Sequence, residues 1–217
     1  MSTPQIKTMY SNESEYNKVQ SRLGELDENC VKGLGLKAQY LFGCRRSELC
    51  GKWAILSDAI SFDRFEGHDV VVFYLKTAKR DGKIRPIALP KNMPWVPEIS
   101  DLFKDRKGKA FPFSPKTLYR AAIECYAGFE YEIDKYFDFE TKKYVDNHKR
   151  CAATHFSRHI RAKELVTRYK FTPIQLTYYM GWKMGRSLGG SVMMDKYINL
   201  QWHDYVSKFL GEHINVS

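Results

Sequence analysis

The chain has 217 residues and carries 35 Lys plus Arg against 25 Asp plus Glu, a formal net charge of +10. With 43% hydrophobic and 28% charged residues it can bury a core, which excludes a disordered or low-complexity chain. No run approaches the ~18 apolar residues of a membrane span, and the polar start after Met1 lacks the apolar stretch of a secretory signal. Five cysteines, an odd number without C-x-x-C spacing, favour reduced thiols over a disulfide framework or a zinc module.

The charge favours a polyanionic partner, because clustered Lys and Arg release counterions from phosphates. Solubility or an acidic protein partner would account for the same charge. We expect one folded domain that stays inside the cell and does not enter a membrane.

The first third of the chain is predicted to be helical after a flexible start over residues 1–12. Asn12 and Glu15 form a capping-box pattern, and apolar residues then recur at helical spacing. A second apolar stripe runs up to Gly43, although two glycines within it weaken the helix prediction. We expect helices over residues 13–26, 31–42 and 45–53.

The pattern then changes to short β-rich runs separated by the turn signals Glu66-Gly67 and Asp81-Gly82. These runs predict a three-stranded antiparallel sheet with strands over residues 60–62, 70–75 and 84–89. Residues 90–97, which contain three prolines, are interpreted as a linker.

Helices return after the linker, since Ser114 and Pro115 are typical of an N-cap and a first helical position. The aromatic and charged stretch over residues 129–147 has no clear period and is interpreted as a hairpin or loop insertion. The expected fold class is α+β, mostly helical with a small antiparallel sheet. The helices expected in this part cover residues 114–126, 154–169, 172–180, 193–200 and 203–210.

Two basic clusters are candidate phosphate sites. Arg45 and Arg46 stand at a predicted helix start, where main-chain N–H groups and the helix dipole favour an anion, although an exposed helix start with a salt bridge to Glu48 explains them too. The second cluster surrounds the Asp81-Gly82 turn, where lysines also commonly protect sheet edges. Its members are Lys76, Lys79, Arg80, Lys83 and Arg85.

His155 and His159 lie four residues apart on one face of a predicted helix, as in a zinc-binding helix. Phe156 stands where the zinc proteases have a glutamate, and no third ligand is evident. The spacing of His155 and Arg158 instead places an imidazole beside a guanidinium, which suits two oxygens of one phosphate.

Five short motifs follow one another along the chain: Gly-Cys-Arg-Arg-Ser-Glu-Leu at 43–49, the lysine-bearing hairpin, Thr-His-Phe-Ser-Arg-His at 154–159, Met-Gly-Trp at 180–182, and a tyrosine near the C-terminus. In this order and spacing the chain resembles the catalytic domain of the tyrosine recombinase, or phage integrase, family. The resemblance covers about Val31 to Leu200.

The resemblance implies cleavage and rejoining of DNA through a 3′-phosphotyrosyl intermediate, with no metal and no cofactor. The implied catalytic residues are Arg45, Lys76, His155, Arg158, Trp182 and Tyr197, with Glu48 as a structural acid. In the mechanism that the resemblance implies, the two arginines would hold the non-bridging oxygens and Trp182 would donate its indole N–H. Tyr197 would attack with His155 as the general base, and Lys76, with Lys79 as its alternative, would protonate the leaving 5′-oxygen. The implied DNA contacts are Arg46, Lys79, Arg80, Lys83, Arg85 and His159.

Two departures from the family pattern shape the expectations. The interval from Trp182 to Tyr197 is longer than usual, so Tyr178, Tyr179 and Tyr205 stay as alternatives for the nucleophile. Residues 13–217 are expected to form the catalytic domain without the amino-terminal core-binding domain that closes the family's clamp.

The expected partner is double-stranded DNA, and the expected location is cytoplasmic, at the host-cell nucleoid. Whether a homotetramer assembles on the DNA is left open by the sequence. Two other functions stay open: a non-catalytic DNA-binding module on the same fold, and a DNA-relaxing enzyme similar to type IB topoisomerases.

Overall fold

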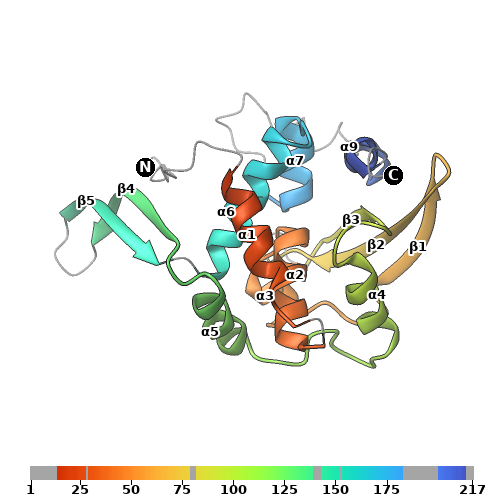
Figure 1. Ribbon diagram of the computed structural model, residues 1–217, viewed down its shortest axis with the longest axis horizontal. Coiled ribbons are helices and arrows are strands. Elements are labelled where there is room, and N and C mark those ends of the chain that lie inside the picture. The colour runs from red at the N-terminus through yellow and green to blue at the C-terminus, as the bar shows by residue number, and fades with distance from the viewer. Residues whose placement is uncertain are drawn as a thin grey trace.

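The computed structural model describes residues 14–27, 29–78, 82–138, 143–151, 153–182 and 200–213. Within these residues the chain forms eight α-helices, a three-stranded antiparallel sheet and a two-stranded hairpin, which confirms the α+β class (Figure 1). The elements are α1 Ser14–Gly24, α2 Val31–Phe42, α3 Arg46–Leu49, β1 Ile60–Phe65, β2 His68–Lys76, β3 Ile84–Pro90, α4 Val96–Lys104, α5 Pro115–Cys125, β4 Glu130–Asp138, β5 Lys143–Cys151, α6 Thr154–Thr167, α7 Pro173–Met180 and α9 His203–His213.

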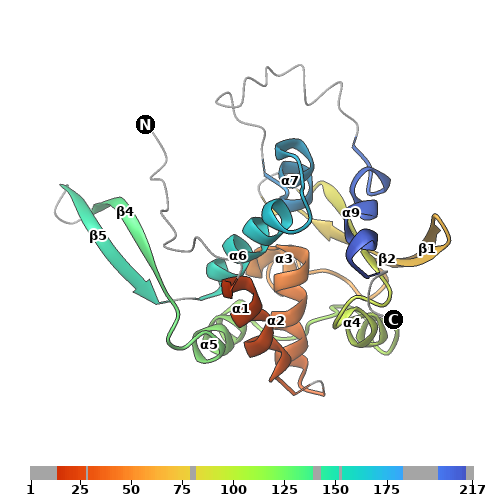
Figure 2. The same ribbon diagram turned by 45° about the horizontal axis from the view of Figure 1, so that its top comes forward.

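Helix α2 forms the centre of the helical part, and its residues from Gly33 to Phe42 are all buried. It packs against α1, α5 and α6, and the two views in Figures 1 and 2 show it enclosed by these helices. A Cβ atom on Gly35 would lie 2.5 Å from the ring of Phe113, so this glycine permits close packing. Burial thus outweighs the low helix propensity of glycine that weakened the sequence prediction.

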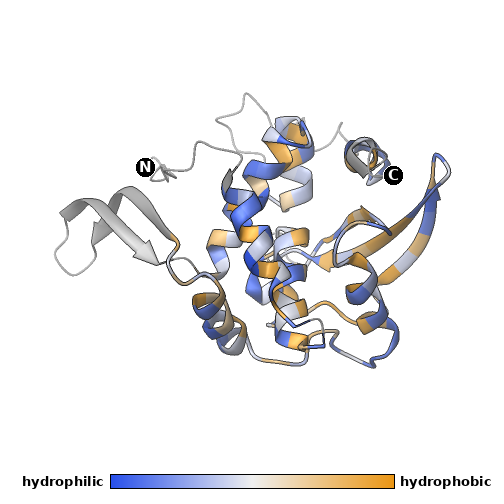
Figure 3. Cartoon of the chain, in the orientation of Figure 1, coloured by the Kyte–Doolittle hydropathy of each residue, from blue (hydrophilic) through white to orange (hydrophobic). Residues whose placement is uncertain are grey.

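The three-stranded sheet has the order β1-β2-β3, with Phe73 opposite Ile60 on one side and Ile87 on the other. The run Val70–Phe73 is buried, which requires cover on both faces of the central strand. Figure 1 shows the sheet between α9 and α4, and the rings of Phe73 and Phe103 lie 5.2 Å apart on the α4 side. Figure 3 shows hydrophobic residues along β2 and β3 and hydrophilic ones toward the outer end of β1.

Helix α4 corrects the interpretation of residues 90–97 as a linker, because Pro90 still belongs to β3 and α4 begins at Val96. Val96, Ile99 and Phe103 have helical spacing and are buried, and Pro97 occupies the first turn, where a missing N–H costs nothing. The prolines masked this short amphipathic pattern. The other predicted elements are present with boundaries shifted by a few residues, and the predicted helix over 193–200 lies outside the described residues except for Leu200.

The stretch predicted to be a hairpin or loop insertion is a β-hairpin, in which β4 pairs with β5 from Glu130–Cys151 to Asp138–Lys143. Figures 1 and 2 show it extending away from the helical body. None of the helices in the described part of the chain combines the length and apolarity needed to span a membrane.

Candidate functional site

Two helices end side by side in the same way. α2 ends at Gly43 and α7 at Gly181, both with positive φ (54° and 62°), and the residue after each glycine donates its N–H back into the last turn. A Cβ atom on Gly43 would lie 2.7 Å from Sδ of Met180, so the two ends are in direct contact. The last carbonyl groups of both helices therefore lack intrahelical partners at one buried place.

Two buried arginines satisfy these carbonyl groups, and each arginine bridges both helix ends. Arg85 on β3 donates to Phe42 O (3.4 Å) and to Tyr179 O. Arg158 on α6 donates to Gly43 O and to Met180 O. A positive charge at a helix C-terminus is stabilised by the helix dipole, so the arrangement offsets part of the cost of burying two guanidinium groups.

Glu48 on α3 supplies the negative charge between the arginines and is fully buried. Its carboxylate lies 2.9 Å from Nη1 of Arg45, 3.6 Å from Nη2 of Arg85 and 3.9 Å from Nη1 of Arg158. It also accepts hydrogen bonds from the main-chain N–H groups of Arg45 and Ala78, both at 3.0 Å. One carboxylate thus joins the α3 start, β3, α6 and the chain that follows β2. We refer to Arg45, Glu48, Arg85 and Arg158 as the arginine cluster.

The arginine cluster carries excess positive charge, because three guanidinium groups surround one carboxylate. Burial raises the pKa of Glu48, but Arg85 and the two main-chain N–H groups together lower it by more than burial raises it. The pKa of Glu48 therefore lies below the usual value of a glutamate. Burial and the charges of Arg85 and Arg45 lower the pKa of Arg158 to about 9, which leaves it protonated at neutral pH. Only Arg45 in the cluster has an appreciably exposed side chain, 19% against 5% for Arg85 and 3% for Arg158. Arg45 is therefore the member that an anion from solvent would meet first.

The other described residues predicted to be catalytic lie beside the arginine cluster. Lys76 is exposed at the end of β2, two residues before the Ala78 N–H that Glu48 binds, hence within about 7 Å along the chain. Trp182 follows the C-cap glycine of α7, and its ring lies 5.8 Å from Cζ of Arg158. His155 is exposed on the first turn of α6, one turn from Arg158.

His159 is half-buried, with its ring 4.7 Å from the ring of His155. Burial and the adjacent Arg158 lower the pKa of His159, so its imidazole is neutral at pH 7. Its Nε2 is buried without a hydrogen-bond partner among the described residues. No group of three or more potential metal ligands occurs within the described ranges.

The residues predicted to contact DNA have different environments. Arg85, predicted to be part of a basic hairpin surface, is instead an interior residue of the arginine cluster, because its strand position faces the two helix ends. Lys83 is exposed, and Arg46 is exposed with its guanidinium 5.3 Å from the ring centre of Tyr119. Lys79 and Arg80 lie outside the described residues.

The tyrosines considered as nucleophiles also differ in burial and in hydrogen bonding. Tyr197 lies outside the described residues. Tyr179 is buried and donates its hydroxyl to Leu41 O at 2.6 Å. Tyr205 is buried as well, accepting from the N–H of Ala88 (3.0 Å) and donating to Pro86 O (2.9 Å), so its hydroxyl holds α9 against β3. Burial raises the pKa of half-buried Tyr178, which makes the phenolate harder to form. Of these three alternatives, Tyr179 and Tyr205 have structural roles.

Sequence reasoning did not identify Gly43, Gly181 and Ala78 as part of the site. Gly43 marks the end of the predicted helix before it, and Gly181 lies within the Met-Gly-Trp motif, but neither pattern shows that the two helix ends meet. The role of Ala78 is carried by its main-chain N–H, which no side-chain pattern reveals.

Comparison of the chain with models of known protein families, with curated proteins and with solved structures finds no significant match.

Proposed function

We propose that this chain cuts and rejoins duplex DNA through a tyrosine nucleophile, as a tyrosine recombinase does. The observation that supports the proposal most is the convergence of separate sequence motifs on one carboxylate. Arg45 and Arg158 approach Glu48, the chain after Lys76 donates to it, and Trp182 lies against Arg158. A site of excess positive charge that opens to solvent at Arg45 suits a phosphodiester group.

In this proposal the phosphate approaches Arg45, and the fixed charges of Arg85 and Arg158 behind it stabilise the extra negative charge of the transition state. The buried arginines need no reorganisation, because main-chain carbonyl groups already hold them in place. Lys76 protonates the leaving 5′-oxygen, and His155 accepts the proton of the tyrosine hydroxyl. Tyr197 is the proposed nucleophile, and its hydroxyl replaces the 5′-oxygen on phosphorus, so that one phosphodiester bond breaks as another ester bond forms.

A non-catalytic DNA-binding module is the second candidate. The burial of Arg158 favours it, since both of its terminal nitrogens donate to main-chain carbonyl groups. A purely structural arginine would have this environment too.

Incubation with nicked duplex DNA, followed by denaturing electrophoresis and mass spectrometry, separates the two candidates. We expect a covalent protein–DNA product linked through Tyr197, absent in Tyr197→Phe and retained in Tyr119→Phe, which alters an exposed tyrosine. Arg45→Ala should lower the rate about 10²–10³-fold, while Arg22→Ala, at an exposed helix position, should leave it unchanged. Arg45→Lys keeps the charge beside Glu48 and controls for folding. Duplex binding without any covalent product would support the binding module instead.

A further inference from the structure

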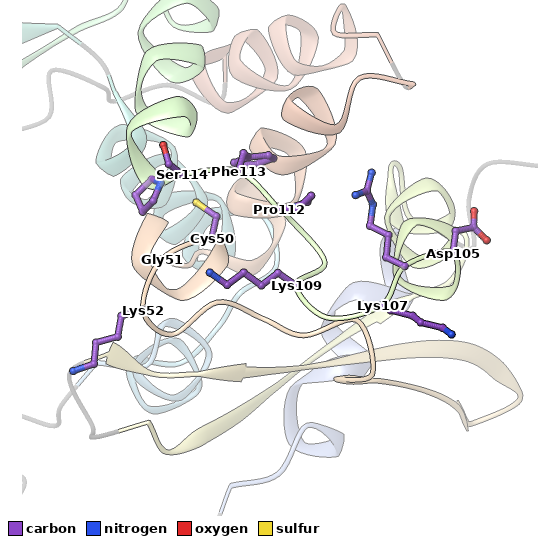
Figure 4. Close-up of a pocket in the computed structure, with 11 residues that line it drawn as sticks. Cys50, Gly51, Lys52, Asp105, Lys107, Lys109, Pro112, Phe113 and Ser114 are labelled. Atoms are coloured by element: carbon purple, nitrogen blue, oxygen red, sulfur yellow. The ribbon is translucent and has the colours of Figure 1, made fainter.

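A second basic feature lies outside the arginine cluster. A surface groove of about 950 Å³ lies between the loop that follows α3, the loop that joins α4 to α5, and the first turn of α5 (Figure 4). Four of its lining residues are basic: Lys52, Arg106, Lys107 and Lys109. Figure 4 shows Lys52 and Lys107 at opposite ends, with Lys109 between them.

The charges of this groove are largely unneutralised. Asp105 is the one acidic residue among the described residues that line it, and Figure 4 shows it at the Lys107 end. The three lysines are exposed, and none of the ion pairs found among the described residues involves them or Arg106. Nε of Arg106 is buried without a hydrogen-bond partner in the described part of the chain. A row of cations held on two loops is an attractive site for a row of anions.

The groove continues from the end of α3 that is opposite Arg45. Cys50 begins the groove and donates its thiol to Arg46 O at 3.3 Å. Arg45 and Cys50 are five positions apart, about 1.4 helical turns, so the two sites lie about 8 Å apart along the helix axis. Neighbouring base pairs of a duplex place their phosphates about 3.4 Å apart along its axis. A backbone whose phosphate meets Arg45 therefore reaches the groove within a few nucleotides.

The lining favours a phosphate backbone over other occupants. Small-molecule pockets enclose their ligand, whereas this groove is open to solvent and presents cations along its length. Phe113 is the one aromatic residue among the described residues that line it, and its ring packs against Gly35. These residues therefore offer one half-buried ring, whereas single-strand binding proteins stack successive bases on several aromatic side chains.

We infer that this groove binds the phosphodiester backbone of duplex DNA next to the phosphate at Arg45, through Lys52, Lys107 and Lys109. The inference rests on the proposed function and adds the path of the flanking DNA. The contact is to the backbone, so it adds affinity without sequence preference.

The salt dependence of DNA binding tests the inference. Affinity for a 30-base-pair duplex is measured between 50 and 200 mM salt for the wild type, for Lys107→Gln/Lys109→Gln, and for Lys18→Gln/Lys91→Gln. The last variant loses the same charge at exposed positions of α1 and the β3–α4 loop, so it controls for net charge. Each lost phosphate contact lowers the slope of log affinity against log salt by about 0.9 and weakens binding about tenfold near 0.1 M salt.

We expect a slope about 1.8 lower for the groove variant, the same change on a second duplex of unrelated sequence, and no change for the control variant. Lys52→Gln, at the other end of the groove, should lower the slope by about 0.9. Equal slopes for the groove variant and the control overturn the inference. Tighter binding of a single-stranded 30-mer than of the duplex, lost in the groove variant, overturns the assignment to duplex DNA.

Covalent capture on nicked DNA, run in parallel, separates this inference from the proposed function. A reduced slope without any covalent product supports the groove and contradicts strand cleavage. A covalent product with an unchanged slope supports cleavage and overturns the groove. Absence of duplex binding by the wild type overturns both.

Discussion

Replacing Glu48 with glutamine keeps the shape of the side chain and removes its negative charge. Three guanidinium groups then face one another without a counter-charge, and one carboxylate oxygen becomes an NH2 group that points at hydrogen-bond donors. Breaking a buried ion cluster by removing one partner costs about 3–5 kcal/mol. In a chain of this size each kcal/mol shifts the melting temperature by about 2–4 °C, so Glu48→Gln should lower it by about 6–20 °C.

Urea unfolding followed by circular dichroism at pH 7 measures this loss, with an unchanged dependence on urea concentration showing that the unfolded state is the same. Glu25→Gln is the matched control, because Glu25 is 63% exposed and its ion pair with Arg22 is long at 3.9 Å. This control should change stability by less than about 0.5 kcal/mol. A Glu48→Gln protein as stable as the control would refute the view that this carboxylate balances the arginines.

The pH dependence gives a second check on the same substitution. The folded-state pKa of Glu48 lies below its unfolded value of about 4.3, since Arg85 and the main-chain N–H groups more than offset burial. A lowered carboxyl pKa contributes stability above the unfolded value and loses it as the pH falls through the folded one. The stability difference between the wild type and Glu48→Gln should therefore shrink below pH ~4. A difference that stays constant down to pH 3 would contradict this assignment.

Two further substitutions test the elements around the cluster by thermal unfolding. Gly181→Ala should lower the free energy of unfolding by about 1–3 kcal/mol, because φ of Gly181 is 62° and the new Cβ atom would lie 3.0 Å from atoms of Arg85. Gly211→Ala in α9 is the control and should leave the stability unchanged or raise it, since a Cβ atom there meets nothing within 4 Å. Tyr205→Phe should cost about 1–3 kcal/mol by leaving two main-chain groups of β3 unpaired. It should leave DNA cleavage intact below the melting temperature, and loss of covalent capture by the folded variant would count against its structural role.

Local patterns in the sequence were sufficient to predict most elements of the fold. Three of these patterns depend on interactions within a few residues. Thr172 caps α7 while its own N–H donates to the side chain of Gln175, α2 ends at Gly43, and Gly67 forms the turn between β1 and β2. Helix α4 was not predicted because the prolines at its start are typical of a linker. Its three buried apolar residues stabilise a helix only when the sheet covers them.

The candidate site, too, was predictable from the sequence only in part. The sequence by itself determined which residue types are present and in which order, and the family resemblance that this order carries implied Arg45, Glu48, Arg158 and Trp182 as members of one site. Only the tertiary structure decided that Arg85 is an interior partner of two helix ends rather than part of a basic surface. The physical reason is that side-chain burial and carbonyl capping depend on which elements meet in space, and residues 43, 85, 158 and 181 are far apart in the chain.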